Sequence, residues 1–105
     1  AHIRVARQLL LEQPSTAETA FCMLIQRYVQ GLGAQDKFHH TLSVALLRLI
    51  AKRLQPGQDW DTFQARNVDL FHAAQSLLAK HYSAEQLARG RCHWVAPDRL
   101  PLSKN

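Results

Sequence analysis

Apolar residues recur every three or four positions through most of this chain, which is the spacing of amphipathic helices. The first such segment covers about residues 1–12, and its apolar positions are Ile3, Ala6, Leu9 and Leu10. We expect it to end before Pro14, because the residue that precedes a proline disfavours the helical conformation. The pattern therefore predicts a short amphipathic helix at the start of the sequence.

A second helix is predicted from about residue 15 to Gly31. Ser15 and Glu18 have the spacing of a capping box, in which the serine hydroxyl and the glutamate bind backbone N–H groups of the first turn. Gly31 and Gly33 then favour a helix end. The residues expected to be buried are Ala17, Ala20, Phe21, Leu24, Tyr28 and Leu32, with Cys22, Ile25 and Val29 widening the stripe. A stripe this wide predicts contact with two neighbouring helices.

The longest strongly apolar segment is 36–54, which contains neither glycine nor proline. Its main apolar positions are Phe38, Leu42, Ala45, Leu46, Leu49 and Ile50, and Val44, Leu47 and Leu54 extend the apolar surface. A helix that is apolar around so much of its circumference is typical of the middle of a bundle. We therefore predict a central helix over 36–54, capped by Asp36, with the other helices packed around it.

Shorter helices are predicted in the second half of the chain. Asp59 is placed to cap a short helix, and another helix is expected over about 68–82, with Asn67 either breaking or bending the chain between them. Ser83 repeats the capping pattern for a last short helix, which Gly90 closes. Trp60, Phe63 and Trp94 are interpreted as aromatics that pack between helices rather than as platforms for bases.

Residues from about 92 to 105 include two prolines and have no helical period, so an extended tail is expected. Trp94 and Val95 should pack back onto the body of the protein. The fold class predicted from these patterns is all-α. We expect a single domain, 1–105, that forms a bundle of four to six helices.

The composition restricts the function classes without choosing one. A hydrophobic fraction of 47% and a charged fraction of 20% indicate an ordinary globular protein. The net charge of +5 permits attraction to nucleic acid, but the basic residues are spread along the chain. The densest group, Arg48 with Lys52 and Arg53, is interpreted as solvated surface at a helix end.

Two cysteines, Cys22 and Cys92, are too few for a disulfide framework, which suits a reducing compartment. The sequence has no apolar run of membrane-spanning length, and residues 1–8 lack the pattern of a signal peptide. We therefore expect a cytoplasmic location and no membrane partner. No motif indicates a cofactor, so none is predicted.

Histidines and carboxylates provide one candidate for site chemistry. The candidate metal ligands are His2, His39, Asp69 and His72, of which the last two are three positions apart and share a helix face. If their helices converge, these groups could bind a transition metal. However, no two of these histidines have the i, i+4 spacing of a helical zinc motif. The alternative, which we favour, is that they are capping or interface histidines bonded to backbone.

A second candidate is the polar side of the central helix near His39, Thr41 and Ser43. Buried hydroxyl and imidazole groups must be hydrogen-bonded, so these side chains either form a structural network or line a small pocket. Nothing in the sequence marks Ser43 as a nucleophile. A structural network is therefore the preferred interpretation.

Residues 83–91 resemble the first half of a helix-turn-helix, so nucleic-acid binding is a further hypothesis. Pro97 and Pro101 count against it, because they would break the recognition helix that should follow. We therefore rank this hypothesis third.

Short motifs along the whole chain resemble a family of small, wholly helical bacterial proteins with no assigned activity. The motifs are His2-Ile3-Arg4-Val5-Ala6, Lys37-Phe38-His39 with Thr41-Leu42-Ser43, Trp60-x-x-Phe63 with Asn67-x-Asp69-Leu70, Tyr82-Ser83, and Arg91 before Trp94-Val95-x-Pro97-Asp98. The resemblance implies one compact helical domain. It also implies a shared pocket formed by the polar motif members, which are His2, Arg4, His39, Thr41, Asn67, Asp69 and Arg91. The chain departs from the pattern at Val68, where proline is expected, and at His40, which matches no motif position.

The leading hypothesis is a small non-enzymatic binding or interaction protein, with a polar pocket around His2 and His39. Self-association through apolar helix faces is expected, because this number of helices leaves such faces uncovered. A small-molecule ligand is compatible with the pocket. The alternative is a metal-dependent or histidine-based enzyme that uses His2, His39 and Asp69, and the third hypothesis is a nucleic-acid-binding protein.

Overall fold

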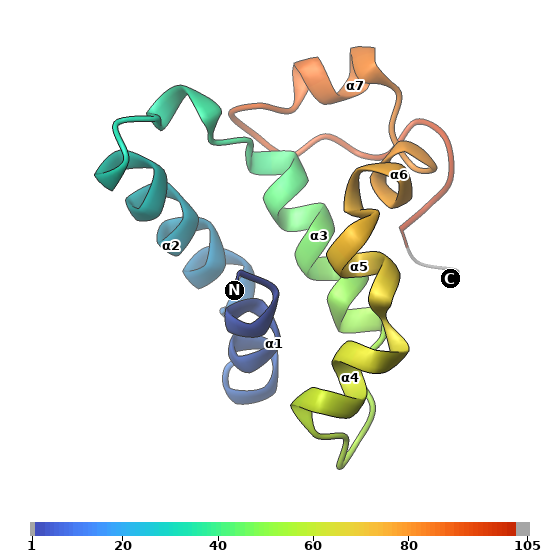
Figure 1. Ribbon diagram of the computed structural model, residues 1–105. Coiled ribbons are helices and arrows are strands. Elements are labelled where there is room, and N and C mark those ends of the chain that lie inside the picture. The colour runs from blue at the N-terminus through green and yellow to red at the C-terminus, as the bar shows by residue number, and fades with distance from the viewer. Residues whose placement is uncertain (1, 103–105) are drawn as a thin grey trace.

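The computed structural model describes residues 2–102, which fold into helices joined by short connections (Figure 1). The α-helices are α1 (His2–Glu12), α2 (Ala17–Gly31), α3 (His40–Lys52), α4 (Trp60–Arg66), α5 (Val68–His72), α6 (Ala74–Ala79) and α7 (Ala84–Arg89), and a short 3-10 helix, η1, covers Gln35–Lys37. No β-strand occurs in the part of the chain that is described. The all-α fold class is therefore confirmed. The radius of gyration is 13.7 Å, which is that of a compact chain of this length.

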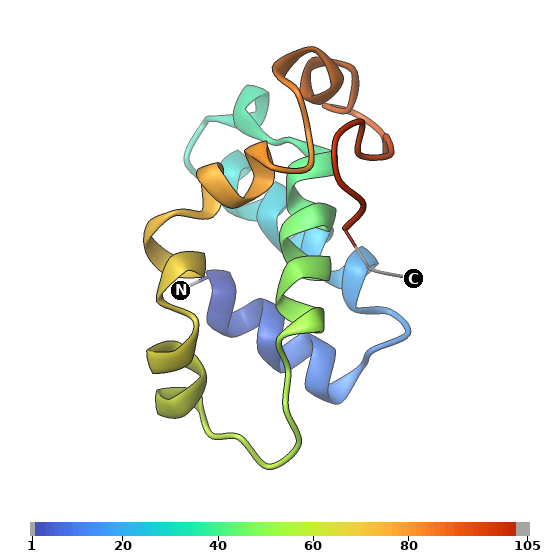
Figure 2. The same ribbon diagram turned by 90° about the vertical axis from the view of Figure 1, so that its right-hand side faces the viewer.

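The central position predicted for the apolar segment 36–54 is confirmed for α3. Helices α1 and α2 lie on one side of α3, and α4 to α6 lie on the other (Figures 1 and 2). Helix α7 and residues 90–102, which we call the C-terminal segment, cover the end where α3 begins. The residues of α3 that are buried are Thr41, Val44, Ala45, Leu47, Leu49 and Ile50. Ala45, Leu47, Leu49 and Ile50 join one hydrophobic core, whose other members include Ala6, Phe21, Phe63, Leu70, Leu78 and Tyr82.

The predicted start of the central helix is wrong. Asp36 lies in η1, and the cap of α3 is His39, whose Nδ1 accepts a hydrogen bond from the backbone N–H of Leu42. The first N–H groups of a helix have no partner within the helix. Here the backbone N–H of His40 donates to the carbonyl of Arg91, and that of Thr41 donates to the carbonyl of Gly90. The C-terminal segment therefore fixes where α3 begins.

Helix α2 begins near the predicted residue, but the predicted capping box is not formed. Thr16 occupies the cap position without a side-chain bond to the helix, and its hydroxyl donates to Oε1 of Gln13 at 3.2 Å. The helix ends at Gly31, as predicted, and Gly33 has a φ of 70°, which glycine adopts without steric cost. Cys22 is buried on this helix, as expected of a free thiol in an apolar stripe.

The second half contains more helices than expected because the segment predicted over 68–82 is divided. Ala73, with φ −138° and ψ 31°, separates α5 from α6. Asn67 separates α4 from α5, and its buried side chain donates to the carbonyl of Phe63 at 2.8 Å, which competes with regular helix geometry. The predicted caps Asp59 and Ser83 are both confirmed by side-chain hydrogen bonds to backbone N–H groups.

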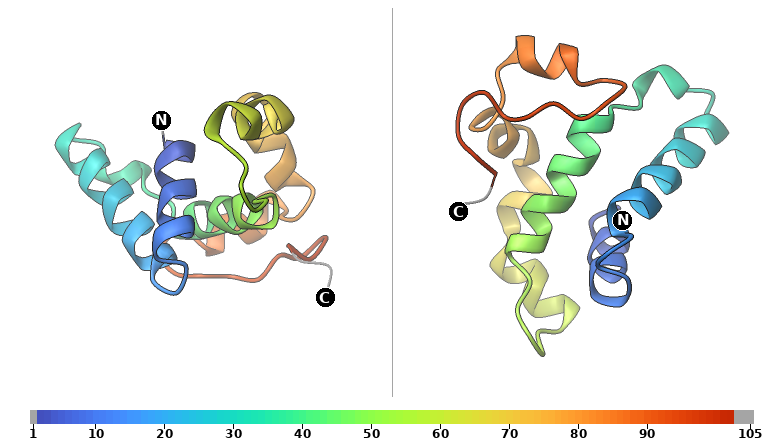
Figure 3. Two further views of the ribbon diagram at one scale, coloured as in Figure 1. Left: turned by 90° about the horizontal axis from the view of Figure 1, so that it is seen from below. Right: turned by 180° about the vertical axis from the view of Figure 1, so that it is seen from behind.

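Residues 90–102 contain no helix and run back across the start of α3 and along α6 and α7 (Figures 2 and 3). Trp94 and Val95 pack against the hydrophobic core, as predicted, and Leu102 is buried in it. The remainder of the predicted tail, residues 103–105, lies outside the described residues. The C-terminal segment is therefore part of the packed fold up to its last described residue.

Candidate functional site

His39 and Thr41 lie together at the start of α3, and backbone groups occupy their polar atoms. Nδ1 of His39 accepts from Leu42, so Nε2 carries the proton and donates to the carbonyl of Leu87 at 2.8 Å. The fully buried hydroxyl of Thr41 donates to the carbonyl of His93 at 2.9 Å and accepts from the backbone N–H of Val95 at 3.2 Å. This arrangement is a structural network that ties α3 to α7 and to the C-terminal segment.

Asn67 and Asp69 also lie together, and both interact with Arg53. The Arg53 guanidinium donates to the two carboxylate oxygens of Asp69 at 2.5 and 2.9 Å and approaches Oδ1 of Asn67 at 3.4 Å. These hydrogen bonds are the main reason why the pKa of Asp69 is lowered. The three side chains line a polar cavity of about 640 Å³ with Lys52, Gln55, Gln58 and Arg66. Arg53, which the sequence indicated to be solvated surface, is therefore a structural partner of α5.

Of the other predicted site residues, Arg91 lies beside the start of α3, where its carbonyl accepts from His40, and the rest lie in separate places. The His2 ring packs edge-on against Tyr28, with ring centroids 4.8 Å apart. The Arg4 guanidinium lies 5.2 Å from the centre of the Trp60 ring. Arg91 donates to the backbone carbonyl of Asp36. His72 is exposed on α5, where it borders a cavity that Asp61, Gln64, Ala65, Val68 and Phe71 also line.

The structure does not gather the candidate metal ligands. Within residues 2–102, no group of three or more His, Cys, Asp or Glu side chains could hold a metal ion. His2 lines a cavity of about 400 Å³ formed by α1 and α2, and His39 is not among its lining residues. The pocket expected around His2 and His39 together is therefore not formed in the described part of the chain.

The exposed surface of α1 and α2 is apolar where burial was expected. Leu24, Tyr28 and Leu32 were predicted to be buried, but their exposed fractions are 42%, 53% and 64%. The stripe that contains Ala17 and Phe21 faces the core instead, so the neighbouring stripe turns outward. Val5 of α1 is also exposed and lines the His2 cavity with Leu24 and Tyr28. We call Val5, Leu24, Tyr28 and Leu32 the α1–α2 face.

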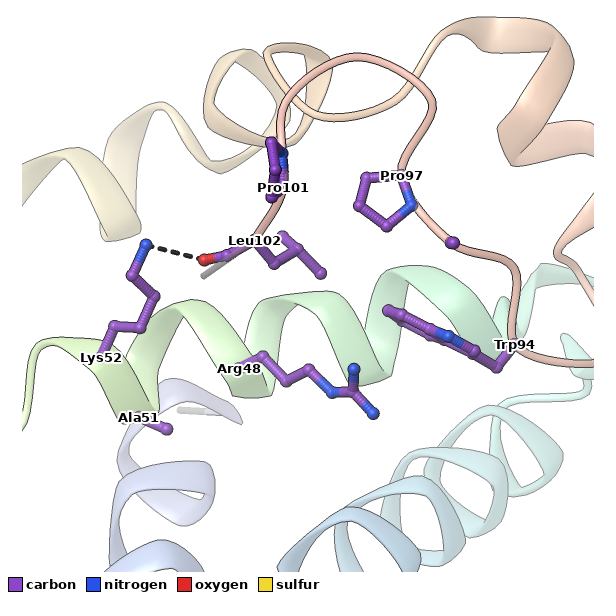
Figure 4. A pocket seen from close by; sticks show the side chains of 8 residues that line it. Arg48, Ala51, Lys52, Trp94, Pro97, Pro101 and Leu102 are labelled. Carbon is purple, nitrogen blue, oxygen red and sulfur yellow. Dashed lines mark hydrogen bonds between the residues drawn. The ribbon is translucent and has the colours of Figure 1, made fainter. Parts of the chain in front are cut away.

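Sequence reasoning missed a further hollow, which lies between α3 and the C-terminal segment. Its cationic residues, Arg48 and Lys52, are one helical turn apart on α3, and Trp94 lies at one end (Figure 4). The i, i+4 spacing of the two cations was visible in the sequence, but the segment that faces them could not be identified from helical periodicity. The aromatic interpretation of Trp94 as a packing residue holds, since it also contacts the core.

Comparisons with protein-family models, curated proteins and solved structures gave no match for this chain. The resemblance to a family of small helical proteins therefore rests on the short motifs alone. None of the helices within residues 2–102 is both long and apolar enough to cross a bilayer.

Proposed function

We propose that this chain is a small interaction protein that associates with a second copy of itself through the α1–α2 face. The observation that carries the proposal is the exposure of large apolar side chains at i, i+4 spacing, namely Leu24 and Tyr28 on α2 and Leu32 directly after its last residue. Val5 on the neighbouring helix continues this surface. Contiguous apolar surface of this kind is typical of protein–protein contacts.

The total exposed area also supports self-association. The accessible surface is 6820 Å², and a monomer of 12.0 kDa is expected to expose about 6,000 Å². The excess is comparable with the roughly 800 Å² that each partner buries in an interface of standard size. A twofold contact would place the same face of both copies together, so the α1–α2 face would cover itself.

Light scattering coupled to size exclusion tests the proposal over a range of protein concentrations. The wild type should elute with about twice the mass of the chain at high concentration. Leu24→Glu should remain a monomer, because the new carboxylate would be buried against apolar groups in the contact. Val68→Glu is the matched control, since Val68 is exposed to 52% on α5 and lies outside the α1–α2 face.

Salt adds an independent test. Each copy carries a formal charge of +5, so two copies repel one another and screening by salt should strengthen their association. Binding to nucleic acid would weaken with salt instead. A wild type that stays monomeric at all concentrations, or a Leu24→Glu variant that associates as the wild type does, would contradict the proposal.

A further inference from the structure

The hollow between α3 and the C-terminal segment has the size and lining of a small-molecule site (Figure 4). Its volume is about 460 Å³, which lies in the range of about 300–1,000 Å³ that ligand sites occupy. The lining residues are Arg48, Ala51, Lys52, Trp94, Ala96, Pro97, Pro101 and Leu102. Six of these eight side chains are apolar or aromatic, so the chemistry of the hollow depends on two cations.

Hydrogen bonds hold the outer wall of the hollow in place. The Tyr82 hydroxyl donates to the carbonyl of Val95 at 2.7 Å, and the Gln86 amide donates to the carbonyl of Ala96 at 2.8 Å. The Asp98 carboxylate accepts from both the backbone N–H and the hydroxyl of Ser83. These bonds fix the chain on both sides of Pro97.

Further hydrogen bonds hold the part of the wall that follows Asp98. The backbone N–H of Arg99 donates to the carbonyl of His81 at 2.9 Å, and the carbonyl of Leu100 lies 2.8 Å from Nδ1 of His81. Lys52 then donates to the carbonyl of Leu102 at 2.7 Å. A wall that is ordered before a ligand arrives avoids much of the entropy cost of binding.

The two cations differ in how fully their charges are compensated. Nε and Nη2 of Arg48 donate to the two carboxylate oxygens of Glu18 at 2.8 and 3.5 Å, and the guanidinium carbon lies 4.2 Å from the centre of the Trp94 ring. The Lys52 ammonium has three donors, of which the carbonyl of Leu102 occupies one. Across residues 2–102 the ion pairs are Arg48–Glu18 and Arg53–Asp69, so no described carboxylate neutralises Lys52.

We propose that this hollow binds a small organic acid with an apolar body. The acid group would bind the ammonium of Lys52 and Nη1 of Arg48, the guanidinium nitrogen that does not donate to Glu18. The body would lie against Trp94, Pro97 and Pro101. Glu18 competes with the ligand for Arg48, so its charge sets the affinity of the site. This site is separate from the α1–α2 face, and it does not depend on self-association.

Nuclear magnetic resonance of the two indole N–H groups tests the proposal with benzoate as the probe. Benzoate should shift the Trp94 signal in a saturable way, while the Trp60 signal, from the other side of α3, stays as an internal reference. Benzamide has the same ring without the charge and should bind at least about tenfold more weakly, since a charge-assisted hydrogen bond contributes about 1.5–3 kcal/mol. Inorganic phosphate has the charge without the apolar body and should also bind weakly.

Variants with opposite expected effects separate a binding site from damage to the fold. Lys52→Gln should weaken benzoate binding about tenfold, and Glu18→Gln should strengthen it by releasing Arg48. Ala51→Leu should abolish it by filling the hollow. Lys37→Gln removes an equal charge on η1 and should change the affinity little.

Three outcomes would overturn the proposal: no saturable shift at millimolar benzoate, equal affinity for benzamide, or weaker binding in Glu18→Gln. The last outcome would show that benzoate does not use Arg48. Because the readout is binding by the Trp94 signal, it is independent of the oligomer mass that tests the α1–α2 face.

Discussion

Replacing Thr41 by valine tests whether the start of α3 is a structural network or a ligand site. The two side chains have nearly the same shape, so the change removes a hydroxyl without opening a cavity. Thr41 is fully buried, and its hydroxyl is the partner of two backbone groups, the carbonyl of His93 and the N–H of Val95. Both groups would lose that partner in the variant.

The expected cost follows from those two groups. A buried donor or acceptor left without a partner costs about 1–3 kcal/mol, and His93 is exposed while Val95 is partly buried, so the lower part of the range applies to the two groups. Thr41→Val should therefore lower the free energy of unfolding by about 2–4 kcal/mol. That is a large part of the roughly 5–15 kcal/mol by which a typical domain is stable. The C-terminal segment should also loosen, because the same hydroxyl holds two of its residues.

Urea unfolding, followed by circular dichroism and by tryptophan fluorescence, measures this cost. The midpoint should fall by at least about 1 M if the slope has the value usual for a small domain. Thr19→Val, at an exposed position of α2, is the control and should change stability by no more than about 0.5 kcal/mol. An equally small change in Thr41→Val would refute the network interpretation.

Two other predictions concern the same region. A methyl group on Gly90 would lie 2.6 Å from Cγ2 of Val95 and closer still to Oγ1 of Thr41. Gly90→Ala should therefore destabilise the protein by about 1–3 kcal/mol. Gly31→Ala is the control and should not destabilise it, because a methyl group there meets no atom within 4 Å. Thermal unfolding of both variants checks this, and equal midpoints would contradict it. Burial raises the pKa of Tyr82 to about 12, above the usual value of about 10 for a tyrosine. The protein should therefore keep this contribution to stability below about pH 10 and lose it as the pH rises towards 12, and Tyr82→Phe should remove the loss. Urea midpoints measured across pH 9–12 test the sign, and a wild type that grows more stable over this range would contradict it.

Helix existence could be predicted from the sequence because apolar spacing is a local property. The central helix, the ends of α1 and α2 and the caps Asp59 and Ser83 all follow from residues within one or two turns of each other. The start of α3 could not be predicted in this way. Its N–H groups bind carbonyls of Gly90 and Arg91, which are about fifty positions away in the sequence.

The orientation of a helix was harder to predict than its presence. The apolar stripe of α2 is wide enough that two different faces could be turned to the core. Phe21 and Ala17 face it, and Leu24, Tyr28 and Leu32 do not. The choice depends on how α1 and α3 fill the space beside α2, and periodicity in one helix contains no information about that packing.

Among the predicted site residues, the pairs close in sequence were brought together, and of the distant ones Arg91 lies beside such a pair, at the start of α3, through its backbone carbonyl. His39 lies with Thr41, and Asn67 lies with Asp69, because each pair shares one short segment. The partners that give these residues their role, such as Arg53, come from other elements and were not identified as such. For the same reason the hollow beside Arg48 could not be predicted, since its outer wall is the irregular C-terminal segment.

The C-terminal segment connects the stability of the fold with the proposed ligand site. It supplies the carbonyls that begin α3 and, a few residues later, the wall of the hollow beside the same helix. A ligand that binds to this wall only when it is in place must also stabilise the segment, because binding and ordering are thermodynamically linked. Thr41→Val, which loosens the segment at His93 and Val95, should therefore weaken benzoate binding although Thr41 does not line the hollow. If the wall formed only around the ligand, Thr41→Val would leave benzoate binding unchanged. Weaker binding in this variant therefore indicates a wall that is part of the fold.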